Sequence, residues 1–302
     1  REIILVAGKG GVGKTTCAAA LALALARDRP VALVGTDPAG SLADVLGVAV
    51  SEEGTRVGKR LRVRELDAEA AYGRFREDYR ENIEAVFQEL GVGRSLALDR
   101  HVLEELWSLA PPGMDEIFAL VRVLDAVEEE ETVVVDAAPT GHFLRLLAMP
   151  ELAADWTRQV LRLMVKVREL GGLEGMMEGL LGFARRLRRL RETLASPERS
   201  GVLLVTLEEP VVRAETERLG RSLTEAGVVV AAVLVNRRAE ADAGAVHAGA
   251  THAGATHAGA VQAGAAHITA PELTPAPRRP ERLLEFFDTW TLAENAGRPA
   301  AG

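Results

Sequence analysis

One short stretch, Val6–Thr16 (VAGKGGVGKTT), constrains the fold of this chain more than any other. Residues 8–15 fit the pattern G-x-x-x-x-G-K-[ST]. The apolar run Glu2–Ala7 before them predicts a buried strand, and the Ala- and Leu-rich segment from Lys14 to about Arg27 predicts a helix. Glycines in such a loop turn backbone N–H groups toward phosphate oxygens, and the N-terminus of the helix favours negative charge. The stretch therefore predicts a site for a nucleoside triphosphate.

The chemistry of this loop assigns a role to two of its side chains. Lys14 is expected to neutralise the β- and γ-phosphate oxygens, and the Thr15 hydroxyl is expected to ligate Mg²⁺. A nucleoside triphosphate and Mg²⁺ are therefore the expected cofactors, and the family resemblance described below implies that the nucleotide is ATP. The residues expected to bind the nucleotide here are Gly8, Lys9, Gly10, Gly11, Val12, Gly13, Lys14, Thr15 and Thr16.

A second lysine, Lys9, stands among the glycines of the same loop. The chain has 36 basic residues, and its lysines are only Lys9, Lys14, Lys59 and Lys166. Arg and Lys differ as phosphate ligands, so two lysines in one short loop of an Arg-rich chain indicate chemistry at both positions.

The rest of the sequence alternates between strands and helices. Apolar runs predict further strands at Val31–Gly35, Leu61–Leu66, Thr132–Asp136, Val202–Thr206 and Val228–Val235, with a helix near Glu215–Ala226 between the last two. Two long segments with helical periodicity interrupt this alternation. We therefore expect an α/β protein with a doubly wound, mostly parallel sheet, a P-loop NTPase core, and a helical subdomain inserted in two segments.

These segments set the expected domain organisation. Residues 1–290 form a single ATPase domain, in which the core covers about 1–66, 130–148, 200–240 and 267–290. The helical subdomain covers about 67–128 and 149–196. A five-residue repeat of AGATH type runs from Gly244 to His267. Residues 241–266 are interpreted as a low-complexity linker, and 292–302 as a disordered tail.

The repeat places His247, His252, His257 and His267 in phase, which raises the question of a metal site. Residues five apart on a helix point in different directions, and on an extended strand they lie about 16 Å apart. Neither geometry gathers the imidazoles around one ion, so we favour the linker interpretation.

Composition narrows the class of protein. The net charge of −8 lacks the positive excess that is typical of proteins that bind nucleic acid. Cys17 is the only cysteine, which excludes an intrachain disulfide and suits a reducing compartment. No apolar run is long enough to span a bilayer and no signal peptide is visible, so we expect a cytoplasmic protein with at most transient membrane association.

Three motifs together resemble one family. The loop K-G-G-x-G-K-T-T resembles the deviant Walker A motif of dimeric ATPases of the signal-recognition, MinD and nitrogenase-iron-protein class. The segments Gly35–Asp44 (GTDPAGSLAD) and Val135–His142 (VDAAPTGH) resemble switch I and switch II of the ArsA-type ATPases, which include the arsenite-pump ATPase and the targeting factor for tail-anchored membrane proteins. Glu215–Arg218 resembles the ETER segment of that family. The resemblance covers about residues 2–240 and 268–287.

The resemblance implies further site residues. Lys9 would reach across a dimer interface to the nucleotide of the facing subunit, so we expect a homodimer. Asp37 would orient or deprotonate the attacking water, which makes Asp37, Lys14 and Lys9 the expected catalytic residues. Asp136 would hold Mg²⁺ through water, and the Gly141 N–H would sense the γ-phosphate. The resemblance also places two residues against adenine, Asn236 and Pro271, the latter followed by Arg278. Whether His142 takes part stays open.

The chain also departs from the family pattern. Gly40 stands where the family has His in switch I, which leaves any relay through that position in doubt. The zinc-binding C-x-x-C pair of the targeting factors is absent, and the metalloid site of the arsenite pump needs three thiols. We therefore expect neither a zinc nor a metalloid site.

The segment Leu170–Leu194 lies where tail-anchor targeting factors have client-binding helices. Its Met-rich surface would suit varied apolar ligands, although an ordinary helix packed on the core is an equal alternative. The basic run from Arg185 to Arg191 beside Leu187, Leu190 and Leu194 is interpreted as the solvated face of an amphipathic helix, with an acidic partner or anionic lipid as the alternative. The expected client-binding residues are Met164, Met176, Met177, Leu180, Leu181 and Phe183.

Three functions are compatible with these features. The first is a dimeric ATPase whose nucleotide state controls a hydrophobic groove for tail-anchored-like membrane-protein segments. The second is the energising subunit of an anion or metalloid transporter, against which the missing thiols count for arsenite. The third is a MinD- or ParA-like positioning switch, which predicts an amphipathic membrane-targeting tail that Thr291–Gly302 does not provide.

Overall fold

The computed structural model describes residues 2–36, 42–66, 132–137, 174–239 and 265–292, together with a few isolated helical positions between residues 73 and 162. The chain divides into two compact units. The first comprises Arg1–Leu66, Asp125–Leu144 and Thr193–Gly302, and the second comprises Asp67–Leu124 and Arg145–Glu192. The expected helical subdomain falls mostly outside the described residues.

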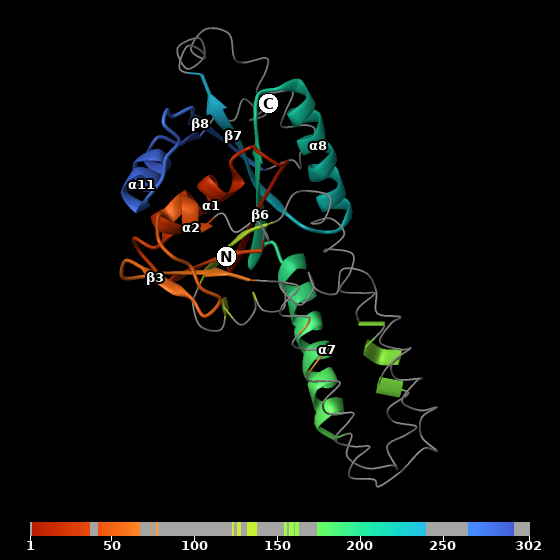
Figure 1. Ribbon diagram of the computed structural model, residues 1–302. Coiled ribbons are helices and arrows are strands. Elements are labelled where there is room, and N and C mark those ends of the chain that lie inside the picture. Colours follow the sequence, from red (N-terminus) through yellow and green to blue (C-terminus); the bar gives the residue numbers. More distant parts are fainter. Residues whose placement is uncertain are drawn as a thin grey trace. The chain divides into compact units, whose positions relative to one another are not determined.

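A nine-stranded sheet forms the first unit within the described residues (Figure 1). Its order is β3-β4-β2-β5-β1-β6-β7-β8-β9. Neighbouring strands are parallel from β4 to β8, and only β3 and β9 at the two edges are antiparallel. The expected α/β fold with a mostly parallel sheet is confirmed. The strands are β1 Ile3–Ala7, β2 Val31–Gly35, β3 Thr55–Val57, β4 Leu61–Glu65, β5 Thr132–Asp136, β6 Ser200–Thr206, β7 Val230–Arg238, β8 Ala266–Pro271 and β9 Thr291–Leu292.

Helices cover both faces of this sheet. On one face α1 (Lys14–Leu25) packs beside α2 (Leu42–Leu46) and α11 (Pro280–Asp288), and on the other lies α8 (Pro210–Glu225), as Figure 1 shows. Helix α1 is apolar almost all round, with five alanines in KTTCAAALALAL, and most of it is buried. Such a helix is stable only between other elements, here the sheet and its two neighbouring helices. Arg27, just after α1, pairs with Asp288 at the end of α11 (Nη1–Oδ1 2.8 Å).

Several element boundaries differ from those expected. Helix α8 begins at Pro210 rather than near Glu215, because proline is favoured in the first turn, where its missing N–H is not needed. The antiparallel hairpin β3–β4 was not predicted. Leu292, assigned to the disordered tail, lies in β9, where it pairs with Ile268.

The end of the AGATH repeat also belongs to the sheet. Ala266, assigned to the linker, is the first residue of β8, and His267 follows it in register with Val233 of β7. His267 is half-buried, and this burial lowers the pKa of its imidazole. The residues from 240 to 264, which hold the other histidines of the repeat, lie outside the described residues.

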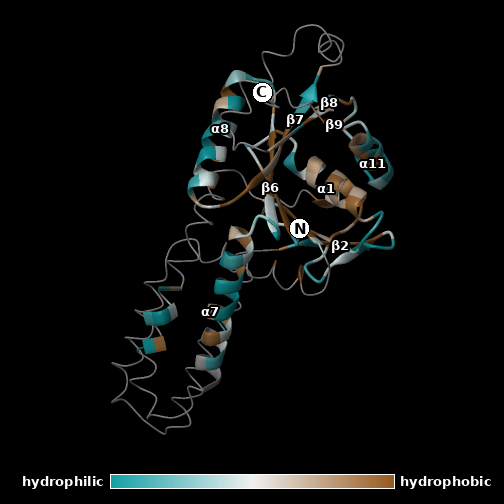
Figure 2. Ribbon diagram, turned by 180° about the vertical axis from the view of Figure 1, so that it is seen from behind, coloured by the Kyte–Doolittle hydropathy of each residue, from teal (hydrophilic) through white to brown (hydrophobic). Residues whose placement is uncertain are grey.

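Helix α7 (Glu174–Ala195) is amphipathic over residues 181–195, and Figure 2 shows the alternation of hydrophilic and hydrophobic residues along it. Phe183, Leu187, Leu190 and Leu194 are buried at helical spacing. The arginines between them are exposed, which fits the interpretation of a solvated basic face. Among the described residues, no helix is both long enough and apolar enough to cross a membrane.

Candidate nucleotide-binding site

The glycine-rich loop lies at the centre of the sheet. It follows β1, which stands between β5 and β6, with Val6 opposite Asp136 and Ala7 opposite Leu204. The strand order changes direction at β1, because β5 and then β2 lie on one side of it, and β6 and then β7 lie on the other. In doubly wound sheets, ligands bind outside the carboxyl ends of the strands at such a switch point.

Close packing against β6 and β7 explains two glycines of the loop. Gly8 has φ +153°, and a Cβ at this position would lie 2.2 Å from the carbonyl oxygen of Val205 in β6. Gly13 has φ +93°, and its Cβ would lie 2.5 Å from Nδ2 of Asn236 in β7. Only glycine fits both positions, so the loop is seated on the carboxyl ends of β6 and β7.

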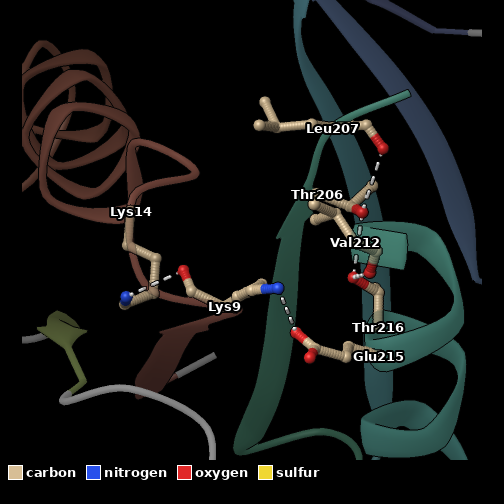
Figure 3. Close-up of polar contacts among 7 residues, drawn as sticks. All are labelled: Lys9, Lys14, Thr206, Leu207, Val212, Glu215 and Thr216. Atoms are coloured by element: carbon tan, nitrogen blue, oxygen red, sulfur yellow. Dashed lines mark hydrogen bonds and ion pairs between the residues drawn. The ribbon is translucent and has the colours of Figure 1, made fainter. Parts of the chain in front are cut away.

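The two lysines of the loop point in opposite directions (Figure 3). Lys14, the first residue of α1, is buried, and its ammonium donates a hydrogen bond to the backbone carbonyl of Lys9 at 3.3 Å. The Lys9 ammonium extends instead to Glu215 on α8, where Nζ and Oε2 are 3.1 Å apart. Lys14 is therefore held over its own loop, whereas Lys9 is held to one side of it.

Asn236 of β7 contacts the phosphate loop directly. Its Nδ2 donates a hydrogen bond to the carbonyl of Val12 at 2.8 Å, and the side chain is buried. The next residue, Arg237, has φ +55°, and the β7–β8 ladder is irregular between Val235 and Arg238. Such an irregularity re-aims a side chain at the end of a strand. The resemblance implied an adenine contact for Asn236, and the structure shows a direct contact with the phosphate loop.

This contact yields a prediction about Asn236. In Asn236→Ala the Val12 carbonyl loses its buried donor, which costs about 1–3 kcal/mol of folding free energy. Because the loop loses this support, the affinities for ATP and for inorganic tripolyphosphate are both expected to fall, as measured by calorimetric titration. Asn236→Asp, which places an acceptor against an acceptor, is expected to be worse than alanine. If the affinity for tripolyphosphate is unchanged and only ATP binding weakens, Asn236 contacts the adenine base and does not support the phosphate loop.

Asp136 and Thr15 offer oxygen ligands close to the loop. Asp136 ends β5, is buried, and lies beside Val6 of β1 and Gly35 of β2. Its backbone carbonyl accepts hydrogen bonds from the N–H (3.1 Å) and the hydroxyl (3.3 Å) of Thr36, the residue before Asp37. Thr15 lies in the first turn of α1 and is half-buried. A carboxylate and a hydroxyl suit Mg²⁺, so this donor set fits the expected metal.

Cys17 lies in α1 and is fully buried. Burial, reinforced by the charge of Asp136, strongly raises the pKa of its thiol, so the thiol stays protonated at neutral pH. A metal or metalloid ligand has to be a thiolate, and Cys17 is therefore poorly suited to that role.

The other predicted residues are only partly placed. Asp37, Gly40, Gly141, His142 and Met164 lie outside the described residues, as do the side chains of Met176, Met177 and Leu180. Pro271 ends β8 and lies in register with Arg238 of the neighbouring β7.

Two side chains of the predicted client surface are described. Leu181 is 47% exposed, as a client surface requires. Phe183 is only 5% exposed, and its role in client binding stays a prediction. The helical spacing of Phe183 with Leu187 and Leu190 places it on the buried side of α7.

Sequence reasoning missed the polar contacts that connect the loop to α8. Thr216 is buried, and its hydroxyl lies 2.9 Å both from the Thr206 hydroxyl at the end of β6 and from the Val212 carbonyl (Figure 3). The ETER segment contains Glu215 and Thr216, and its likeness to a family motif was the only available signal. Nothing in the sequence indicates that Glu215 contacts Lys9.

A phosphate loop of this kind, at the centre of a parallel sheet, defines a P-loop nucleotide-binding protein. The chain belongs to the anion-transporting ATPase (ArsA) family, whose model matches residues 1–245. The resemblance drawn from the switch motifs is therefore confirmed at the level of the family.

Some similar proteins are named as GET3-type ATPases and others as arsenical pump-driving ATPases. ATPase GET3B of Arabidopsis thaliana is 31% identical over 265 residues, which are 78% of this chain and 64% of that protein. The putative arsenical pump-driving ATPase 2 of Aquifex aeolicus is 31% identical over 247 residues, 78% of this chain and 80% of that protein. ATPase ARSA1 of Chlamydomonas reinhardtii is 30% identical over 274 residues, but only 35% of its length is covered. The chain thus spans less than two thirds of some of these relatives.

Proposed function

We propose that this chain hydrolyses Mg-ATP as a dimer, and that its nucleotide state controls a hydrophobic groove for tail-anchored-like membrane-protein segments. The observation that carries the ATPase part is the loop itself, with Lys14 buried over it and Asp136 at the end of the adjacent strand. The relative named ATPase GET3B supports the client part.

In this proposal the residues of the loop bind and orient the triphosphate. Backbone N–H groups and the Lys14 ammonium bind the phosphate oxygens, and Thr15 and Asp136 would hold Mg²⁺. Bound Mg²⁺ would neutralise charge that develops on the phosphates. Asp37 positions the attacking water, and Lys9 supplies a positive charge to the nucleotide of the facing subunit. Release of the Gly141 N–H from the γ-phosphate would move switch II and the helices behind it.

Replacing Asp37 with Asn tests the proposed chemistry. Asparagine keeps the size of the side chain but cannot take a proton, so turnover is expected to fall by about 100-fold or more. Affinity for Mg-ATP is expected to stay close to that of the wild type. Steady-state phosphate release and calorimetric titration measure the two quantities. Turnover at the wild-type rate would remove Asp37 from the mechanism.

The same variant tests the proposed client. A tail-anchored transmembrane helix is co-expressed with the Asp37→Asn protein and purified with and without Mg-ATP. Nucleotide-dependent capture of the helix by two or four chains is the expected result. Absence of capture in both nucleotide states would refute the client groove and leave the ATPase proposal standing.

The second candidate function is that of an energising subunit for an anion transporter. The relative named as a putative arsenical pump-driving ATPase favours it. The burial and protonation of the Cys17 thiol count against arsenite as the ion. Stimulation of ATP hydrolysis by a particular oxyanion, with no capture of a transmembrane helix, would favour this candidate over the first.

A further inference from the structure

Lys9 forms an ion pair with Glu215 of its own chain, whereas the proposed mechanism requires Lys9 at the nucleotide of the facing subunit. Nζ of Lys9 and Oε2 of Glu215 are 3.1 Å apart, and the two side chains are 36% and 34% exposed. Figure 3 shows the Lys9 side chain extending from the loop to α8, away from the Lys14 ammonium. In a single chain, the charge of Lys9 is therefore already balanced by a carboxylate of the same chain.

The fold holds both partners of this pair to the end of one strand. Gly8, which precedes Lys9, approaches the Val205 carbonyl of β6 so closely that no side chain fits between them. Thr216, which follows Glu215, donates to the Thr206 hydroxyl or accepts from it at 2.9 Å, and it is buried. Since Val205 and Thr206 are adjacent, the pair follows from how the loop and α8 are anchored, and it does not depend on the chance meeting of two long surface side chains.

We propose that Glu215 restrains Lys9 in the separate chain. The carboxylate holds the ammonium on its own subunit, and this ion pair must break before Lys9 reaches the nucleotide of a facing subunit. The inference rests on the role of Lys9 in trans that forms part of the proposed function. An ion pair that exists only in the separate chains disfavours the dimer in which Lys9 contacts the facing nucleotide. The free energy of forming that dimer rises by the free energy of the ion pair. For a partly exposed ion pair the expected effect is at most about fivefold.

The restraint is measured through the dependence of ATP hydrolysis on protein concentration. The rate per chain is followed as the full-length protein is diluted, and the concentration that gives half of the maximal rate is determined. In Glu215→Gln this concentration is expected to fall by about threefold to fivefold, with the maximal rate unchanged. Glu225→Gln removes the same charge from the exposed far end of α8 and is expected to behave like the wild type.

A second variant separates the restraint from a general effect of charge near the loop. In Lys9→Ala hydrolysis is expected to be lost, and adding Glu215→Gln should restore nothing, because the restrained group is absent. The pair itself is tested by urea unfolding of the single Lys9→Ala and Glu215→Gln variants and the double variant. The expected result is a midpoint for the double variant equal to that of the less stable single variant, since the second change removes a contact already lost.

The possible outcomes distinguish this inference from the function on which it rests. If hydrolysis by the wild type depends on concentration but Glu215→Gln leaves the half-maximal concentration unchanged or raises it, the restraint is wrong and the trans role of Lys9 stands. Additive urea midpoints would likewise overturn the pair. If wild-type hydrolysis per chain is independent of concentration, the trans role fails, and the restraint fails with it.

Discussion

Replacing Lys14 with alanine is expected to abolish binding of Mg-ATP at ordinary nucleotide concentrations. The Lys14 ammonium is buried and lies over the loop, where its present acceptor is the Lys9 carbonyl. A charged donor in contact with two phosphates contributes about 3 kcal/mol or more, which corresponds to a loss of at least about 100-fold in affinity. Calorimetric titration of the variant with Mg-ATP measures this loss directly.

The matched control for Lys14→Ala is Lys59→Ala. Lys59 is one of the few other lysines of the chain, and it is exposed in the turn between β3 and β4. Its removal changes the net charge by the same amount, so any general electrostatic effect on ATP binding appears in both variants. An affinity of Lys14→Ala within about threefold of the wild type would refute the assignment of the phosphate loop, since such a difference is below 1 kcal/mol.

The second large effect is expected for Gly8→Ala. The new Cβ would lie 2.2 Å from a backbone carbonyl of the central strand β6, at a φ of +153° that side chains rarely adopt. Overpacking and backbone strain together should lower the free energy of unfolding by about 2–6 kcal/mol. Because the backbone of β6 cannot yield as the end of a side chain can, the loop should also be displaced and lose ATP affinity. Urea unfolding and ATP titration measure the two effects.

Gly10→Ala is the matched control within the same loop. No heavy atom lies within 4 Å of the position that a Cβ at Gly10 would take. The urea midpoint of this variant is therefore expected to match that of the wild type. Wild-type stability and ATP affinity in Gly8→Ala would show that the close approach of the loop to β6 is not needed.

The elements that the sequence predicted best are those with a strong local signal. The strands β1, β2 and β5 are continuous apolar runs, as strands buried on both faces must be, and the loop after β1 follows a fixed spacing of glycines and lysine. The short edge strands had no such signal. Strand β9, for instance, is formed by Thr291 and Leu292 only because β8 offers them an edge with which to pair.

The candidate site was predictable in its parts but not in its contacts. Spacing singled out Lys14 and Thr15, and the scarcity of lysine together with the family resemblance singled out Lys9. The pairing of Lys9 with Glu215, and that of Val12 with Asn236, joins residues more than 200 positions apart in the chain, and the parallel crossovers of the sheet bring them together. Local sequence carries no information about such contacts, because they depend on the strand order.

Strand β6 gives the phosphate loop a short and stiff connection to α7. At its carboxyl end lie Val205 and Thr206, on which the loop and α8 are seated. At its amino end Ser200 donates a buried hydrogen bond to the carbonyl of Leu194 in α7 (3.0 Å). The seven residues of the strand span about 20–25 Å, and they pair with β1 on one side and with β7 on the other. The seat of the phosphate loop and the last turn of α7 are therefore fixed to the two ends of one strand.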